Sequence, residues 1–164
     1  MNSPVKRLRL SGMLLGLGLG GFFDGIVFHQ LLQWHHMVSH VDDYPTTTIA
    51  GLEANTLADG VFHAGTLTLT VVGIAFLWQA LQHAPSPWST RAFGGLVLAG
   101  WGIFNVVEGV INHQILELHH VREHVSNHLV WDLGFLGWGA VMMLGGWWIA
   151  RSERQPQPAV ERTS

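Results

Sequence analysis

Two segments of the chain, residues 21–40 and 104–124, carry acidic residues and histidines at the same spacing in apolar surroundings. Each has an acid, a His-Gln pair that begins five residues later, a histidine pair and a final histidine. The matching positions are Asp24 and Glu108, Gly25 and Gly109, His29 and His113, His35-His36 and His119-His120, and His40 and His124. Carboxylates and imidazoles are donors for transition metals. The recurrence predicts a duplicated helix with paired polar sites.

Helical spacing selects candidate ligands within each copy. Positions i, i+4 and i+7 share one face of an α-helix. The residues in this register are His29, Gln33 and His36 in the first copy and His113, Glu117 and His120 in the second. Glu117 and His120 have the carboxylate–histidine spacing of di-metal carboxylate bundles. Gln33 replaces that glutamate in the first copy, so the expected ligand set is asymmetric.

Two further apolar segments bring polar groups to the same depth. Asp59 and His63 lie near the start of one, and His128 and Asp132 lie near the start of the other. Each of the four helices has an arginine or a histidine near its opposite end. At 1.5 Å per helical residue, the polar group of each helix lies roughly 22–30 Å from that residue. Convergence at one depth predicts a single site inside the bundle.

We therefore expect a transition-metal site. The first-choice ligands are His29, His36, His63, His113, His120, Asp24, Asp59, Glu108, Glu117 and Asp132. The alternative ligands or supporting hydrogen-bond partners are His35, His119, His128 and Gln33. Nitrogen and oxygen donors suit Fe, Zn, Mn or Cu(II) better than Cu(I), and Met37 is the only soft donor nearby. The absence of cysteine excludes disulfides, thiolate sites and iron–sulfur clusters.

Composition places these groups in a membrane. The chain has 164 residues, of which 48% are hydrophobic and 12% charged. That balance predicts an integral membrane protein, with the lipid bilayer as partner. The four apolar segments and the repeated motifs predict an all-α four-helix bundle made of two parallel two-helix repeats. A net charge near −3 argues against nucleic acid as a partner. The sequence leaves open a homo-oligomer or a redox partner.

The expected organisation is one domain. Residues 1–9 form the N-terminus, residues 10–150 hold the four helices, and residues 151–164 form a disordered tail. The repeats cover about 10–82 and 92–150, each helix being long enough to span a core of about 30 Å. We expect helices at about 10–32, 56–82, 92 to beyond 117, and 127–150, with loops at 40–55 and 83–91. Gly12, Gly16 and Gly20 form a seam for close helix approach.

The distribution of Lys and Arg predicts the orientation. All of them except Arg122 fall on one side of the four segments. Both termini are then cytoplasmic, in a multi-pass protein of the inner (plasma) membrane. Ten of the eleven histidines lie towards the outer face, and His83 lies on the inner side.

The same motifs resemble a bacterial family of membrane proteins, domain of unknown function 2243. The resemblance covers about residues 10–150. It rests on four motifs: Phe23-Asp24-Gly25 through His36, Asp59-Gly60-x-Phe62-His63, Glu108-Gly109 through Arg122, and Trp131-Asp132-Leu133. It implies a four-helix membrane protein and carries no activity. The histidines match the boxes of membrane di-iron hydroxylases poorly.

Three functions compete with a purely structural role. The first is a redox or oxygen-activating metalloenzyme, the second is haem binding or metal handling by a chaperone or carrier, and the third is an ion pathway. The inner half of each helix offers few polar groups, which argues against the pathway. A structural bundle with Asp–His clamps is the remaining alternative. Because an ionised side chain in a membrane helix costs about 2.5–3.5 kcal/mol, these acids need a compensating partner.

Overall fold

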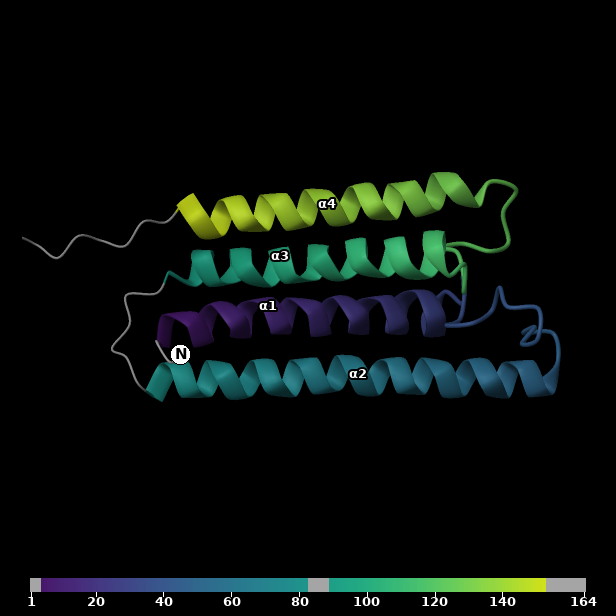
Figure 1. Ribbon diagram of the computed structural model, residues 1–164, viewed down its shortest axis with the longest axis horizontal. Helices are drawn as coiled ribbons and strands as arrows, with labels where there is room; N and C mark the ends of the chain where they lie inside the picture. Colours follow the sequence, from purple (N-terminus) through teal and green to yellow (C-terminus); the bar gives the residue numbers. More distant parts are fainter. Residues whose placement is uncertain (1–3, 83–88, 153–164) are drawn as a thin grey trace, which may run out of the picture.

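Four long helices make up the protein in the computed structural model, which describes residues 4–82 and 89–152 (Figure 1). Each is long and apolar enough to cross a membrane. The elements are α1 (Pro4–Phe23) continuing into the π-helix η1 (Asp24–Leu31), α2 (Ile49–Gln82), α3 (Thr90–Glu108) continuing into the π-helix η2 (Gly109–Ile115), and α4 (His128–Ser152). The predicted all-α membrane four-helix architecture is confirmed.

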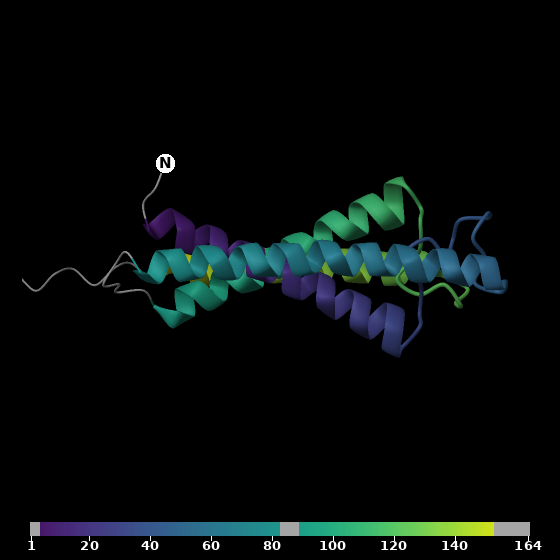
Figure 2. The ribbon, with the colours of Figure 1, turned by 90° about the horizontal axis from the view of Figure 1, so that it is seen from below.

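The helices α1 and α3 form the centre of the bundle. They cross one another, and α2 and α4 lie on opposite sides of the crossing pair (Figures 1 and 2). Within the described ranges, α2 packs mainly on the α1–η1 helix and α4 mainly on the α3–η2 helix. The two central helices are therefore more buried than the flanking helices, whose outer faces are free to contact lipid.

Glycines set the distance between the central helices. A Cβ atom on Gly16 would collide with the backbone of α3 at Val97, and one on Gly100 would collide with the backbone of α1 at Met13. Gly12 and Gly20 also face α3 side chains, so the predicted glycine seam is confirmed. Close backbone approach of this kind is the usual basis of helix association in membranes, where lipid is as apolar as leucine.

Both central helices widen before they end. Leu32 N–H donates to Val27 O at 2.8 Å and Leu116 N–H donates to Ile111 O at 2.8 Å, which are i→i+5 hydrogen bonds. Such π segments are uncommon and occur frequently at functional sites. The next donors, Trp34 and Leu118, reach back six residues at 2.9 Å each, and the chain then leaves the helix. Asp24 and Gly109 begin the two widened segments.

Several predicted boundaries are wrong. The α3–η2 helix ends at Ile115 rather than continuing beyond Glu117, and α2 begins at Ile49 rather than near Thr56. Thr48 starts α2 early, because its hydroxyl accepts from Gly51 N–H and its carbonyl from Leu52 N–H. Helix α4 continues through Ser152, past the predicted start of the tail. His83 and residues 153–164 lie outside the described ranges, and the two-repeat interpretation stays a prediction.

The crossing predicts the outcome of a paired substitution. Gly100→Leu should lower the thermal stability of the detergent-purified protein, because the new side chain must displace the backbone of α1. The expected loss of unfolding free energy is larger than the cost of ordinary overpacking, which is about 1–3 kcal/mol. Gly94→Leu is the matched control, since a Cβ atom there meets nothing within 4 Å. Equal melting temperatures for the two variants would contradict the crossing.

Candidate metal centre

The largest group of buried polar side chains lies where the central helices end. Its innermost members are one acid and two histidines from each half of the chain. They are Asp24, His29, His35, Glu108, His113 and His119, all 6% exposed or less. Asp59 of α2 and Asp132 of α4 flank them and are buried as well. In a hydrocarbon environment each of these groups needs a polar partner.

His29 is held between two helices. Its Nδ1 lies 2.8 Å from Asp59 Oδ1, and its Nε2 lies 3.1 Å from Asp24 Oδ2. Phe62 stacks on the imidazole, with ring centroids 5.6 Å apart. A carboxylate that accepts the Nδ1 proton fixes the ring orientation and leaves Nε2 as the donor atom for a metal.

His113 occupies the matching place in the second half. Its Nδ1 lies 3.7 Å from Asp132 Oδ1, and its Nε2 lies 3.1 Å from Glu108 Oε1. The longer Nδ1 distance is beyond hydrogen-bond length, so this ring is held less firmly than His29. The contacts of the two histidines otherwise correspond.

The connecting loops place two more histidines in the centre. His35 Nδ1 lies 2.8 Å from Val121 O, and His119 Nδ1 lies 3.0 Å from Met37 O. Each loop therefore accepts a ring N–H from the other loop. The His35 and His119 rings stack, with centroids 4.5 Å apart and an interplanar angle of 3°.

Two aspartates hold these loop carbonyls in position. Asp59 Oδ1 accepts Met37 N–H at 2.9 Å, and Asp132 Oδ1 accepts Val121 N–H at 2.9 Å. Asp59 thus fixes Met37, whose carbonyl orients His119. Asp132 likewise fixes Val121, whose carbonyl orients His35. Asn55, fully buried, adds a bond to Val38 N–H. Side chains from α2 and α4 are therefore responsible for the geometry between the central helices.

This arrangement determines where the ring protons lie. A backbone carbonyl can only accept, so His35 and His119 must carry a proton on Nδ1. In the neutral imidazole the Nε2 atom is then a bare lone pair. His119 Nε2 lies 2.9 Å from Glu108 Oε1, which is also an acceptor when ionised. A proton or a cation must lie between two such acceptors.

Several atoms of the centre have no hydrogen-bond partner. Among the described residues they include the Nε2 atoms of His29, His35 and His113, and Glu108 Oε2. His29 Nε2 is near Asp24, yet the contact lacks hydrogen-bond alignment. Two sets of donor atoms lie within 4.8 Å of one another: those of His29, His35 and His119, and those of Glu108, His113 and His119. Either set could hold a metal ion.

His35 is suited to act as a neutral donor. It lies beyond the end of the first membrane span. Burial lowers the pKa of the His35 imidazole well below its usual value, and the neighbouring His119 and His29 rings lower it further. Metal-binding histidine is the neutral form.

His36 and His120 support the centre from outside. The Nδ1 atom of His36 lies 2.7 Å from Asp59 Oδ2, and that of His120 lies 2.8 Å from Asp132 Oδ2. Both side chains are 16% exposed. We predicted His36 and His120 as first-choice ligands and His35 and His119 as alternatives; the structure places the latter pair in the innermost position.

Two predicted ligands lie away from the centre. The helical face expected to carry Gln33 and Glu117 does not exist there, because both central helices end before these residues. Gln33 and Glu117 are exposed and adopt left-handed backbone conformations, with φ of 49° and 48°. Their assignment to a shared helix face with the neighbouring histidines is wrong.

The last two predicted histidines, His63 and His128, bind backbone carbonyls. His63 Nδ1 lies 2.8 Å from Asp59 O, within the same helix. His128 Nε2 lies 2.8 Å from Glu123 O. Neither belongs to the two donor sets of the centre.

One arginine and two tryptophans link the two halves at the same end of the bundle. The Arg122 guanidinium lies 5.1 Å from the Trp34 ring centroid and 4.9 Å from that of Trp131. Cation–π contacts at exposed sites contribute about 0.5–1 kcal/mol each. Ser39 and Glu123 add a hydrogen bond of 2.6 Å between the loops.

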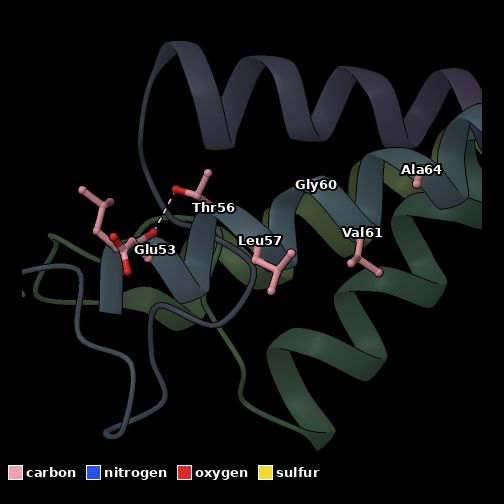
Figure 3. Close-up of a pocket in the computed structure, with 7 residues that line it drawn as sticks. Glu53, Thr56, Leu57, Gly60, Val61 and Ala64 are labelled. Carbon is pink, nitrogen blue, oxygen red and sulfur yellow. Dashed lines mark hydrogen bonds between the residues drawn. The ribbon is translucent and has the colours of Figure 1, made fainter. Parts of the chain in front are cut away.

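A surface groove runs along α2, away from the centre. Figure 3 shows its lining residues, among them Leu57, Gly60, Val61 and Ala64, along the outer face of the helix. None of the centre's acids or histidines lines it. Being apolar and open, this groove is suited to lipid contact.

The chain belongs to a family of membrane proteins. A family model described as "Predicted membrane protein (DUF2243)" matches residues 11–153. The suspected family is therefore confirmed. Comparison with curated proteins and with solved structures gave no match.

The hydrogen bonds of Asp59 predict a large effect on stability. Asp59→Ala should lower the melting temperature markedly, because His29, His36 and Met37 N–H lose their shared acceptor. Breaking a buried pair of this kind costs about 3–5 kcal/mol. Thermal unfolding in detergent measures the effect. Asp42→Ala, in an exposed position of the adjoining loop, is the control; a similar loss in both would disprove the role of Asp59.

Proposed function

We propose that this protein is an integral membrane metalloprotein that binds transition-metal ions at the centre defined above. The observation that carries the proposal is the protonation pattern of His35 and His119. Their Nδ1 atoms donate to loop carbonyls, so their Nε2 atoms are lone pairs in the neutral rings. The Nε2 atom of His119 lies 2.9 Å from Glu108 Oε1, and that of His35 is buried without a partner. A cation satisfies these acceptors without adding a proton to the buried centre.

A structural clamp of Asp–His pairs explains less of the geometry. Hydrogen bonds from His29 to Asp59 and from His120 to Asp132 would suffice for a clamp. A clamp gives no reason for the buried Nε2 atom of His35, which lacks a partner. Leaving a buried polar atom unsatisfied costs about 1–3 kcal/mol. Metal coordination removes that cost.

Ring spacing favours a metal ion over haem. The metal–nitrogen distance of about 2.0–2.1 Å places imidazole centroids around one tetrahedral ion about 5 Å apart. Here His29 and His35 are 4.5 Å apart, and His113 and His119 are 4.9 Å apart. A porphyrin would have to separate rings that already contact one another. The histidine rings, Phe62 and Phe135 occupy that space.

The donor set limits the metals and suggests their number. Four imidazoles and two carboxylates favour Fe, Zn, Mn or Cu(II). The two donor sets share His119 and together comprise five residues, and Asp24 beside His29 is a sixth donor. Because the Nε2 atom of His119 can bind one ion at a time, the sets would hold one ion, or two ions of which only one takes His119. Structural zinc sites reach about 10–16 kcal/mol of binding free energy. That amount offsets the cost of placing the central acids in the membrane.

A redox or oxygen-activating role is the form of this function that the surroundings favour. A second groove is lined by Met37, Val38, Tyr44, Ala54, Leu57, Ala58, Val61 and Phe62. Phe62 stacks on His29, and Met37 binds both Asp59 and His119 through its backbone. An apolar molecule in this groove would lie one residue from the metal ligands.

We further propose that the centre faces the outside of the inner (plasma) membrane. Lys6, Arg7, Arg9, Arg91 and Arg151 mark one end of the bundle, and the centre lies at the opposite end. Arg-rich and Lys-rich ends remain on the cytoplasmic side. Metal ions would then reach the centre from the outer surface.

Metal content tests the proposal. The detergent-purified protein should contain one or two transition-metal ions per chain, or bind them after reconstitution. Removing a hydrogen-bond partner of a metal ligand lowers metal affinity by about 10–100-fold. His119→Ala should lower the metal affinity further than that, because this ring belongs to both donor sets. Elemental analysis and equilibrium titration measure this.

Glu117→Gln serves as the matched control for His119→Ala. Glu117 is acidic and close in sequence, but exposed and outside the centre. Its metal content should equal that of the wild type. A folded His119→Ala variant with unchanged metal affinity would contradict the proposed centre and favour the structural clamp.

A further inference from the structure

Three more histidines gather above the buried centre. His40 comes from the first loop, His120 from the second loop, and His128 begins α4. The His120 ring centroid lies 4.7 Å from that of His40 and 4.6 Å from that of His128. His40 and His128 are 6.4 Å apart. This outer histidine trio is at the surface, since His40 is exposed and the other two are half-buried.

The trio presents free ring nitrogens. His120 uses Nδ1 on Asp132, which leaves Nε2. His128 uses Nε2 on Glu123 O, which leaves Nδ1. The ring of His40 has no hydrogen bond within the described part of the chain, although its backbone N–H is fixed to Leu118 O at 3.0 Å. Two of the three donors are thus oriented by protein acceptors, as metal-binding histidines usually are.

The spacing of the rings fits one ion. Three imidazoles around a tetrahedral ion have centroids about 5 Å apart, given a metal–nitrogen distance of about 2.0–2.1 Å. The observed separations of 4.6, 4.7 and 6.4 Å lie on both sides of that value. Only His40 must turn to close the longest one, and its exposed side chain is free to do so.

We propose that His40, His120 and His128 form a second metal site, separate from the buried centre and open to water at its fourth position. Its three neutral nitrogen donors suit Zn²⁺ or Cu²⁺. Asp132 connects the two sites, because Oδ2 accepts from His120 and Oδ1 accepts from the Val121 backbone below it. The outer trio therefore binds an ion on the aqueous side before the buried ligands are reached.

Zinc titration tests this site independently of the buried centre. The full-length protein in detergent is stripped with a chelator and titrated with Zn²⁺ in competition with a chromogenic chelator. A His35→Ala/His119→Ala background removes two donors from one buried set and one donor from the other. It should still bind one Zn²⁺. Adding His40→Ala and His128→Ala should weaken that binding at least tenfold. Even the loss of a hydrogen-bond partner of a metal ligand weakens metal affinity by about 10–100-fold, and here the ligands themselves are removed.

Controls separate the alternatives. Adding His124→Ala to the same background should leave the affinity unchanged, because this exposed histidine of the second loop is not part of the trio. If the background variant loses its fold, His40→Ala in the wild type gives the answer by removing one bound equivalent. Unchanged zinc affinity and stoichiometry on removal of His40 would overturn the outer site, whatever the buried centre binds.

Discussion

The exchange of hydrogen bonds between the two loops is the constraint on which the centre depends. The carbonyl of Met37 orients His119, and the carbonyl of Val121 orients His35. The Nδ1 atom of each ring is thus bonded by the other half of the chain. The backbone N–H of Met37 and that of Val121 in turn each donate to an aspartate on a flanking helix. Moving any of the four helices would therefore change the direction of at least one central nitrogen.

The helix packing supplies the conditions for this exchange. Backbone contact at Gly16 and Gly100 brings the central helices together at their crossing. The π segments then end each helix near the acids, so the loops return over the bundle. The polar groups must be satisfied within the protein, because hydrocarbon offers them no partner. The centre is the place where the central helices and loops supply such partners.

The sequence was sufficient to predict the four apolar helices and several of the buried polar residues. Hydropathy and the repeated acid–histidine spacing identified Asp24, His29, Glu108 and His113, all of which are buried together. His119, which the sequence offered as an alternative ligand, lies 2.9 Å from Glu108. A loop rather than a continuous helix returns His119 to this acid.

The remaining features depend on backbone geometry that periodicity does not record. An α-helical register cannot anticipate a π segment, and so it assigned Glu117 and Gln33 to faces that end earlier. The distinction between His35 and His36 follows from their partners, which are the Val121 carbonyl for His35 and the Asp59 carboxylate for His36. Adjacent histidines have the same chemistry in the sequence, and only the fold separates the inner donor from the outer support.

The measurement that tests the central claim most directly is a crystal structure of the metal-loaded protein at the absorption edge of its metal. The account predicts an anomalous peak within about 2.3 Å of the Nε2 atom of His119 and at least two other central donors. The Nδ1 atoms of His119, His35 and His29 should retain their contacts with Met37 O, Val121 O and Asp59, respectively. A peak elsewhere, with these Nε2 atoms uncoordinated, would contradict the account.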